Sequence, residues 1–188
     1  MVEVKDRASQ ENIVFFDADK TLWRIESQGN GDDYASKGAF EGTNRTFVLT
    51  QPGEVTRVED WTKLILKEDV VETLQKFSTE GVIAGIISDN EREDVEKVCQ
   101  LLGIWQYFDA AYINIRLWRG PADKNLMISE IFAIHEQQNV KALLVDDSDR
   151  YSQQMADAGH GFILSPKDSF PKDAILDFLG FKINWKMP

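Results

Sequence analysis

The stretch that decides the fold is Val14-Phe15-Phe16-Asp17-Ala18-Asp19-Lys20-Thr21-Leu22-Trp23. It begins as an apolar run, in which apolar and polar residues do not alternate, and it ends abruptly in two aspartates that are two positions apart. Such runs are typical of strands that are buried on both faces, as in a parallel sheet covered by helices. Ligands of these sheets bind beyond the carboxyl ends of the strands. We therefore expect Asp17 and Asp19 to face one pocket, where two acids need a shared proton or a cation.

Length and charge limit the classes of function that are open to the chain. Its 188 residues predict one domain over residues 1–188, with a small flap-like insert over residues 24–60. The formal net charge of −11 disfavours binding to nucleic acid or to an anionic membrane. Cys99 is the one cysteine, and neither a signal peptide nor a membrane-spanning run is evident, so we expect a cytoplasmic protein. Nothing in the sequence predicts an oligomeric state.

Strands and helices alternate along most of the chain. The expected strands cover residues 12–17, 82–88, 110–115, 141–146 and 161–164. Helix periodicity covers residues 61–79, where Glu68 and Asp69 favour a helix N-terminus, and further helices are expected over residues 91–102, 122–137, 149–158 and 171–179. Residues 24–60 are expected to be looped, apart from a hairpin over residues 46–58 that turns at Pro52-Gly53. The alternation predicts βαβ units and a three-layer α/β/α fold with a parallel sheet.

Polar residues follow four of the expected strands. They are Asp17-Ala18-Asp19-Lys20-Thr21 after the first, Ser88-Asp89-Asn90 after the second, Lys124 after the third and Asp146-Asp147 after the fourth. In a parallel sheet all four groups project at one edge. The site would then combine a carboxylate that acts as nucleophile or metal ligand, a second carboxylate, a hydroxyl, a cation and a further acidic pair.

This order and spacing resemble the haloacid dehalogenase superfamily of aspartate-nucleophile phosphatases, over roughly residues 12–180. Within it, the phrase Asp-x-Asp-x-Thr-Leu-Trp and the small insert are most similar to the magnesium-dependent phosphatase family. The resemblance implies a Rossmann-like core, a minimal cap formed by the insert, and a phosphohydrolase of the acid phosphatase type. Relatives often have glycine or an aromatic residue where this chain has Lys20, so the motif departs from theirs at that position.

The resemblance also implies a role for each residue. Asp17 would attack phosphorus and form an aspartyl-phosphate, and Asp19 would act as general acid and then as general base. Mg²⁺ would be held by Asp17, the backbone carbonyl of Asp19 and Asp146. Asp147 would bind the ion through a water molecule or would orient one of these ligands. Lys124 would offset the charge on Asp17. The residues expected to contact the substrate or its phosphate are Ser88, Asp89, Asn90, Lys20 and Arg119.

The favoured function is Mg²⁺-dependent hydrolysis of a phosphomonoester, either a small metabolite such as a sugar phosphate or a phosphoprotein such as one carrying phosphotyrosine. One alternative is a non-catalytic phospho-ligand or protein-interaction module, which the intact Asp17, Asp19, Lys124 and Asp146 disfavour. A phosphotransferase such as a mutase is a further alternative, although the insert is too small for a full helical cap. A response-regulator-like receiver would carry its acidic pair on the first strand.

Ordinary structural roles stay open at several of these positions. Ser88 could serve in a helix cap, and Lys124 could be a surface lysine. Thr21 is expected to hydrogen-bond the turn backbone. Trp23 is expected to pack beneath the insert, and Cys99 to be a small core residue.

Overall fold

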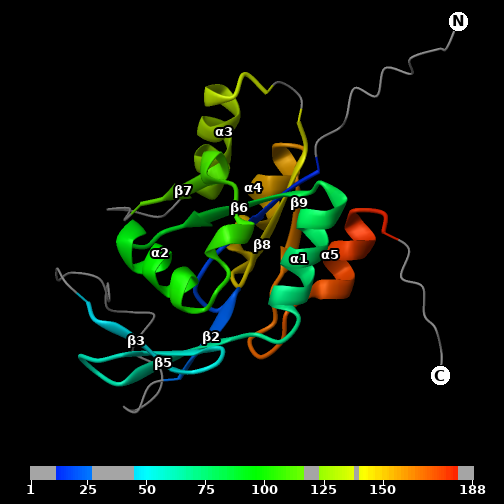
Figure 1. Ribbon diagram of the computed structural model, residues 1–188. Coiled ribbons are helices and arrows are strands. Elements are labelled where there is room, and N and C mark those ends of the chain that lie inside the picture. The colour runs from blue at the N-terminus through cyan, green and yellow to red at the C-terminus, as the bar shows by residue number, and fades with distance from the viewer. Residues whose placement is uncertain (1–11, 27–44, 117–122, 138–139, 182–188) are drawn as a thin grey trace, which may run out of the picture.

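A five-stranded parallel sheet lies at the centre of the computed structural model, which describes residues 12–26, 45–116, 123–137 and 140–181. Strand β1, the first along the chain, occupies the middle of the sheet (Figure 1). In spatial order the strands are β7 (Ile113–Ile115), β6 (Ile83–Ser88), β1 (Ile13–Phe16), β8 (Ala142–Asp146) and β9 (Gly161–Leu164). All four neighbouring pairs are parallel, as the sequence predicts.

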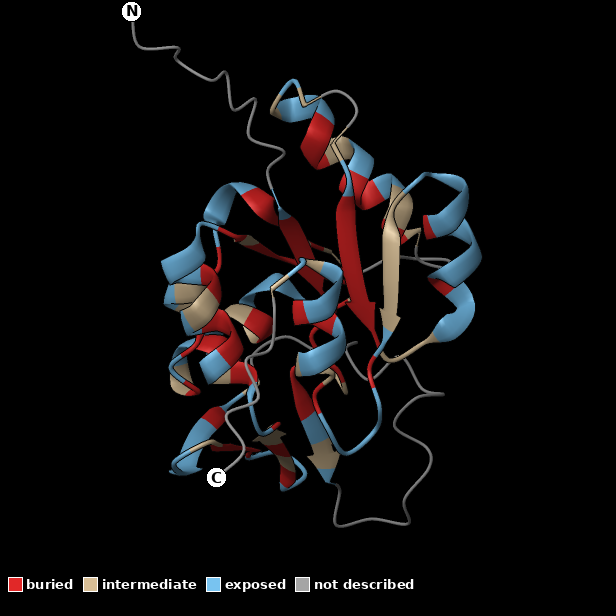
Figure 2. Cartoon of the chain, turned by 90° about the vertical axis from the view of Figure 1, so that its right-hand side faces the viewer, coloured by how far each residue is buried: buried red, intermediate tan, exposed pale blue. Residues whose placement is uncertain are grey.

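Helices cover both faces of this sheet. Val14 and Phe16 of β1 belong to one hydrophobic cluster, and Ile13 and Phe15 belong to a second, because successive strand residues point to opposite faces. The first cluster contains residues of α1 (Val70–Glu80), α2 (Arg92–Leu101) and α5 (Lys172–Phe178), and the second contains residues of α3 (Lys124–Ile134) and α4 (Ser152–Asp157). Figure 2 shows the buried strands between helices whose outer faces are exposed. The three-layer α/β/α fold is thus confirmed.

Four antiparallel strands form a second, smaller sheet beside the carboxyl end of β1. Their spatial order is β2 (Trp23–Glu26), β5 (Thr62–Leu66), β4 (Glu54–Arg57) and β3 (Phe47–Gln51). The hairpin expected over residues 46–58 is present as β3 and β4, and Gly53 takes the left-handed backbone, with φ 79°, that its turn requires. The backbone N–H of Lys67 donates to the carbonyl of Leu22 at 3.0 Å, so the chain enters and leaves this sheet at one place.

Two predictions of secondary structure are wrong in this region. The helix periodicity expected over residues 61–79 fails for residues 62–66, which form strand β5, whereas α1 begins at Val70, next to the helix N-terminus expected near Glu68 and Asp69. The loop expected to start at residue 24 begins instead with strand β2. Both strands depend on pairing with each other across a long stretch of sequence, and such pairing overrides local periodicity. In addition, residues 110–112 form a 3₁₀ turn, so the strand expected over residues 110–115 is shortened to β7.

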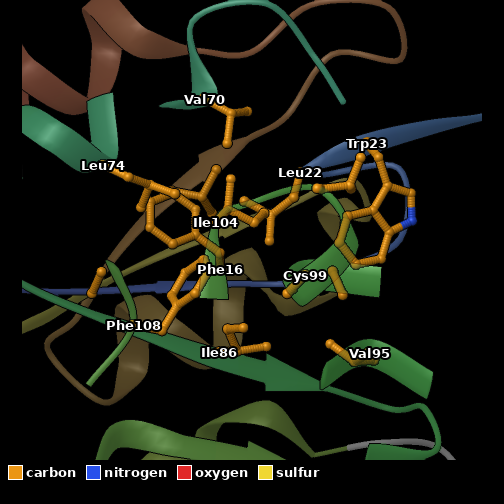
Figure 3. Close-up of a cluster of buried hydrophobic side chains, with 14 of the residues drawn as sticks. Phe16, Leu22, Trp23, Val70, Leu74, Ile86, Val95, Cys99, Ile104 and Phe108 are labelled. Atoms are coloured by element: carbon orange, nitrogen blue, oxygen red, sulfur yellow. The ribbon is translucent and has the colours of Figure 1, made fainter. Parts of the chain in front are cut away.

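Aromatic side chains form a rigid base beneath the end of β1. The ring of Phe16 lies 5.9–6.4 Å, centroid to centroid, from the rings of Phe77, Phe108 and Phe170. Figure 3 shows this part of the core, where Phe16 is fully buried. Because Asp17 follows Phe16 directly, its backbone is fixed by this packing. Among the described residues, no helix is long and apolar enough to cross a membrane.

Candidate active site

Three carboxylates meet at the carboxyl edge of the parallel sheet. Asp17 follows β1, Asp146 ends β8, and Asp147 comes next, and one oxygen of each lies within 4.8 Å of one from the others. The backbone N–H of Asp17 donates to the carbonyl of Val145 at 2.9 Å, which continues the pairing of β1 with β8. Asp17 and Asp146 are both buried. The structure thus brings together the acidic residues that the sequence places after the first and fourth strands.

A single ammonium group bridges two of these carboxylates. Lys124 begins α3, whose first turn is fixed by Asp123, since its carboxylate accepts from the N–H of Leu126 at 2.8 Å. Its Nζ lies 2.7 Å from Asp17 Oδ1 and also contacts Asp146 Oδ2. Burial alone would lower the pKa of Lys124, but the two carboxylates raise it above its usual range. Lys124 is therefore a buried, charged group and not a surface lysine.

The carboxylate of Asp19 is held by two hydrogen-bond donors. The indole Nε1–H of Trp23 donates to Asp19 Oδ1 at 2.8 Å, and the amide of Asn90 donates to Asp19 Oδ2 at 3.2 Å. Burial, and then the negative charge of Asp17, raise the pKa of Asp19 to about 6, although both hydrogen bonds act to lower it. This carboxyl can therefore exchange a proton near neutral pH.

The other two carboxylates are also harder to ionise than usual. Burial, and then the charge of Asp17, raise the pKa of Asp146 to about 6 even though Lys124 opposes the change. The same two causes raise the pKa of Asp147. The positive charge of Lys124 therefore does not compensate the negative charge of all three carboxylates. A set of three close carboxylate oxygens with uncompensated charge fits a hard divalent cation such as Mg²⁺.

A cavity opens over these residues, with about 220 Å³ of room for the centres of water-sized molecules. We call it the catalytic pocket. Its walls come from both sheets and from the loops after β6 and β8. The residues that line it are Asp17, Asp19, Lys20, Ile25, Asp89, Asn90, Lys124, Asp146, Asp147, Ser148, Arg150 and Tyr151.

Only some of the predicted substrate-binding residues line the catalytic pocket. Asp89 and Asn90 line the catalytic pocket, and so does Lys20, which has a left-handed backbone with φ 60°. Ser88 is fully buried behind Asn90, whose amide donates to Ser88 Oγ at 3.0 Å. Arg119 lies outside the described residues.

The hydrogen bond expected from Thr21 to the turn backbone is absent. Its Oγ1 is buried and has no hydrogen-bond partner within the part of the chain that the structure describes.

Four residues of the site were not predicted to act there. Trp23 is buried in the core, as expected, but it also holds Asp19. Ser148 donates its N–H to Asp146 Oδ1 at 2.9 Å. Tyr151 lies beneath Lys124, with its ring centroid 5.1 Å from Nζ, and the guanidinium of Arg150 stacks on the same ring at 4.5 Å. For Ser148, Arg150 and Tyr151, the position directly after Asp146-Asp147 was the available signal, because that loop must border the site.

A family comparison covers most of the chain. The family model of haloacid dehalogenase-like hydrolases matches residues 45–163. This range includes Ser88, Lys124 and the Asp146-Asp147 pair, and it begins after the first two aspartates. No curated protein sequence matches the chain.

Solved structures resemble the chain over nearly its whole length. An uncharacterized protein from Listeria monocytogenes serotype 4b is 16% identical with a TM-score of 0.55, covering 94% of this chain and 85% of its own. The 3-deoxy-D-manno-octulosonate 8-phosphate phosphatase from Moraxella catarrhalis, solved with magnesium, phosphate and KDO, is 13% identical with a TM-score of 0.54, and the coverage is 94% and 90%. A haloacid dehalogenase-like family hydrolase from Streptococcus pneumoniae is also 13% identical, with a TM-score of 0.52 and coverage of 94% and 93%. At such identities the likeness shows the fold alone.

Proposed function

The chain belongs to the haloacid dehalogenase-like hydrolases, and on this premise we propose that it is a Mg²⁺-dependent phosphatase that cleaves phosphomonoesters through a phosphorylated Asp17. One observation carries the proposal. The ammonium group of Lys124 holds Asp17 beside Asp146, while Asp19 stands apart with a pKa near 6. One carboxylate is thus kept ready for attack and another can carry a proton. The Moraxella phosphatase, solved with magnesium and phosphate, supports the choice of phosphoryl chemistry.

In the first step, a carboxylate oxygen of Asp17 attacks phosphorus and the bond from phosphorus to the ester oxygen breaks. Asp19 gives its proton to that oxygen, so the alcohol leaves uncharged. Lys124, at 2.7 Å from Asp17, offsets the negative charge that is brought together in this step. The product of the step is an aspartyl-phosphate at Asp17 and a free alcohol.

In the second step, water attacks the phosphorus of the aspartyl-phosphate. Asp19, now ionised, takes a proton from this water, and the bond between phosphorus and Asp17 breaks. Inorganic phosphate leaves and both aspartates return to their first state. The hydrogen bonds from Trp23 and Asn90 keep Asp19 in position for both transfers.

The residues that would hold Mg²⁺ are Asp17, Asp146 and the backbone carbonyl of Asp19, with Asp147 as a further or water-mediated ligand. When bound, the cation neutralises charge on the carboxylates and on the phosphoryl oxygens. Lys20, Asp89 and Asn90 would contact the phosphoryl group or the rest of the substrate, and their position in the wall of the catalytic pocket supports this role. Ser88 would reach the phosphate only if Asn90 turned aside, since it is fully buried behind that side chain.

Hydrolysis of p-nitrophenyl phosphate by the purified protein tests this function. We expect activity with Mg²⁺, loss of activity in EDTA and its return when Mg²⁺ is restored. Asp17→Asn should remove turnover while the protein stays folded by circular dichroism. Asp173→Asn, an equivalent change at an exposed position on α5, is the matched control and should retain it. Full activity of the Asp17 variant, or of the wild type in chelator, would contradict the proposal.

A further inference from the structure

A large groove lies next to the catalytic pocket. Its walls come from the ends of β1 and β8, from β2 and from the loop after β9, and we call it the polar groove. The residues that line it are Lys20, Arg24, Ile25, Glu26, Asp147, Ser165, Lys167 and Asp168. Lys20, Ile25 and Asp147 also line the catalytic pocket, so the two cavities are neighbours. The two phosphoryl-transfer steps described above leave this groove without a role.

The size of the polar groove fits the organic part of a small substrate. It offers about 560 Å³ of room for the centres of water-sized molecules, against about 220 Å³ in the catalytic pocket. Sites for small molecules commonly measure about 300–1,000 Å³. The catalytic pocket has to hold the phosphoryl group and a cation, so most of the leaving group must lie outside it.

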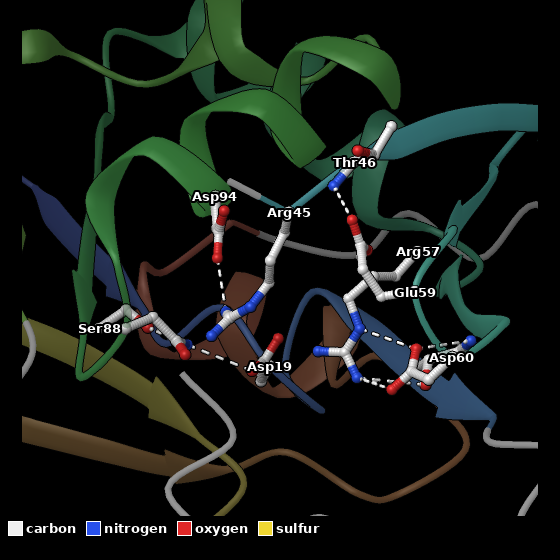
Figure 4. Close-up of polar contacts among 10 residues, drawn as sticks. Asp19, Arg45, Thr46, Arg57, Glu59, Asp60, Ser88 and Asp94 are labelled. Carbon is white, nitrogen blue, oxygen red and sulfur yellow. Dashed lines mark hydrogen bonds and ion pairs between the residues drawn. The ribbon is translucent and has the colours of Figure 1, made fainter. Parts of the chain in front are cut away.

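A third cavity, between the antiparallel sheet and α2, is too small for this purpose. It also borders Asp19, but its room of about 30 Å³ suffices for only one or two water molecules. Asp94 lines it and accepts from Arg45 at 2.6 Å (Figure 4). Arg57 lines it as well, and its Nε–H donates to Asp60 at 2.8 Å. Of these three cavities, only the polar groove has the room that a leaving group needs.

The walls of the polar groove carry mostly polar side chains. Ile25 is the one apolar residue among those that line it. Three of the others are cations, three are acids, and Ser165 adds a hydroxyl. An apolar leaving group would remove water from these side chains without replacing its hydrogen bonds. Hydroxyl groups both donate and accept, so a hydroxyl-rich leaving group can bind to the cations and to the acids.

One wall of the polar groove is fixed to the active site by hydrogen bonds. The backbone N–H of Ser165 donates to the carbonyl of Asp146, the last residue of β8, at 2.7 Å. The Nζ of Lys67, which follows β5, donates to Ser165 Oγ at 3.0 Å and also to the carbonyl of Pro166. The loop that carries Lys167 therefore starts from a fixed point. A wall that is arranged before binding reduces the entropy lost when a ligand is bound.

Lys20 stands at the boundary between the polar groove and the catalytic pocket. It lines both cavities and directly follows Asp19 in the chain. Its left-handed backbone, with φ 60°, is one that glycine adopts more readily than lysine. The ester oxygen must lie beside Asp19 to receive its proton. The group attached to that oxygen therefore lies close to this boundary.

We propose that the polar groove binds the organic part of the substrate, and that this part is a polar, hydroxyl-rich group such as a sugar. Arg24 and Lys167 donate to its hydroxyls, since both line the groove. This inference rests on the proposed phosphatase function, and it chooses a sugar phosphate over a phosphotyrosine protein.

Phosphate esters of primary alcohols with rings of equal size test the polarity of the groove. Glucose 6-phosphate and mannose 6-phosphate carry a hydroxyl-rich six-membered ring on one methylene group. Cyclohexylmethyl phosphate and benzyl phosphate carry a six-membered ring without hydroxyls in the same place. One net hydrogen bond corresponds to roughly two- to tenfold in kcat/KM. We therefore expect the better of the two sugars to exceed both apolar esters by about tenfold or more.

Two substitutions remove donors that line the polar groove and do not line the catalytic pocket. Arg24→Ala and Lys167→Ala each change an exposed side chain, so both variants should stay folded by circular dichroism. In each, the ratio of kcat/KM for the sugar to that for cyclohexylmethyl phosphate should fall by about threefold or more. Lys141→Ala is the control, because this lysine is also exposed but precedes β8, at the opposite edge of the sheet. It should leave the ratio as in the wild type.

The outcomes separate this inference from the function on which it rests. Hydrolysis of p-nitrophenyl phosphate, together with equal kcat/KM for the sugars and cyclohexylmethyl phosphate, would overturn the role of the groove and leave the phosphatase function standing. The same holds if benzyl phosphate or a phosphoserine peptide exceeds both sugars, or if both groove variants keep the wild-type ratio. If no phosphate compound is hydrolysed in the presence of Mg²⁺, the phosphatase function fails and this inference fails with it.

Discussion

Replacing Lys124 with methionine removes the cation that holds the acidic cluster together. Methionine retains much of the length and apolar volume of lysine, so the packing against Tyr151 is largely kept. The change leaves Asp17 and Asp146 buried, with oxygens no more than 4.8 Å apart and no cation between them. The variant therefore isolates an electrostatic effect, and we expect it to be large.

The structure sets the magnitude of this effect. Two unit charges at 4.8 Å repel each other by roughly 3.5 kcal/mol at an effective dielectric constant of about 20. Loss of one partner from a buried ion pair typically costs about 3–5 kcal/mol. Proton uptake limits the penalty, because raising the pKa of an aspartate from 3.8 to 7 costs about 4 kcal/mol. We therefore expect Lys124→Met to lower the free energy of unfolding by about 3–4 kcal/mol at pH 7 in EDTA.

Urea unfolding in EDTA and in Mg²⁺ measures this loss. Mg²⁺ should raise the stability of the variant more than that of the wild type, because the cation can compensate the charge that Lys124 leaves. Lys97→Met, on the exposed face of α2, is the control and should lie within about 0.5 kcal/mol of the wild type. A loss below 1 kcal/mol in EDTA, or an equal response of both proteins to Mg²⁺, would refute the reasoning.

Three further predictions concern residues around the site. Trp23→Phe removes the donor to Asp19, so turnover of phenyl phosphate should fall about tenfold and that of p-nitrophenyl phosphate, whose leaving group needs less protonation, should fall less; equal losses would count against the role of Asp19 as acid. Thr21→Val removes a buried hydroxyl that has no hydrogen-bond partner among the described residues, and thermal unfolding should show a gain of about 1 kcal/mol; a clear loss would place a partner there. Burial lowers the pKa of Lys67 from 10.5 to about 8, so the unfolded chain binds more protons between these pH values and Lys67 makes stability rise with pH. Lys67→Met should flatten that rise in urea titrations, and an unchanged slope would contradict it.

The parallel core and its acidic edge were predictable because their signals are local. Each strand of the core carries its own apolar run, and parallel topology brings the ends of all such strands to one edge. Asp17, Asp146 and Lys124 therefore meet as expected, although more than 100 residues separate the first two. The burial and charge pairing of Lys124 follow from the same topology.

The antiparallel sheet was only partly predictable. The hairpin of β3 and β4 has a local turn at Pro52-Gly53, whereas β2 and β5 pair across 36 or more residues, so their pairing has no short-range sequence signal. Alternation in Trp23-Arg24-Ile25-Glu26 was the available signal for β2. The same alternation points Trp23 inward, but the hydrogen bond from its indole to Asp19 depends on a tight turn that no pattern of apolar residues encodes.

Chemical trapping of the phosphorylated enzyme tests the central claim most directly. Acid quenching during turnover with Mg²⁺ and substrate, followed by borohydride reduction, converts an aspartyl-phosphate to homoserine at the phosphorylated position. Peptide mass spectrometry should then find homoserine at position 17, only when substrate is present and not in Asp17→Asn. Steady turnover without modification of Asp17, or modification of Asp19 in its place, would contradict the mechanism.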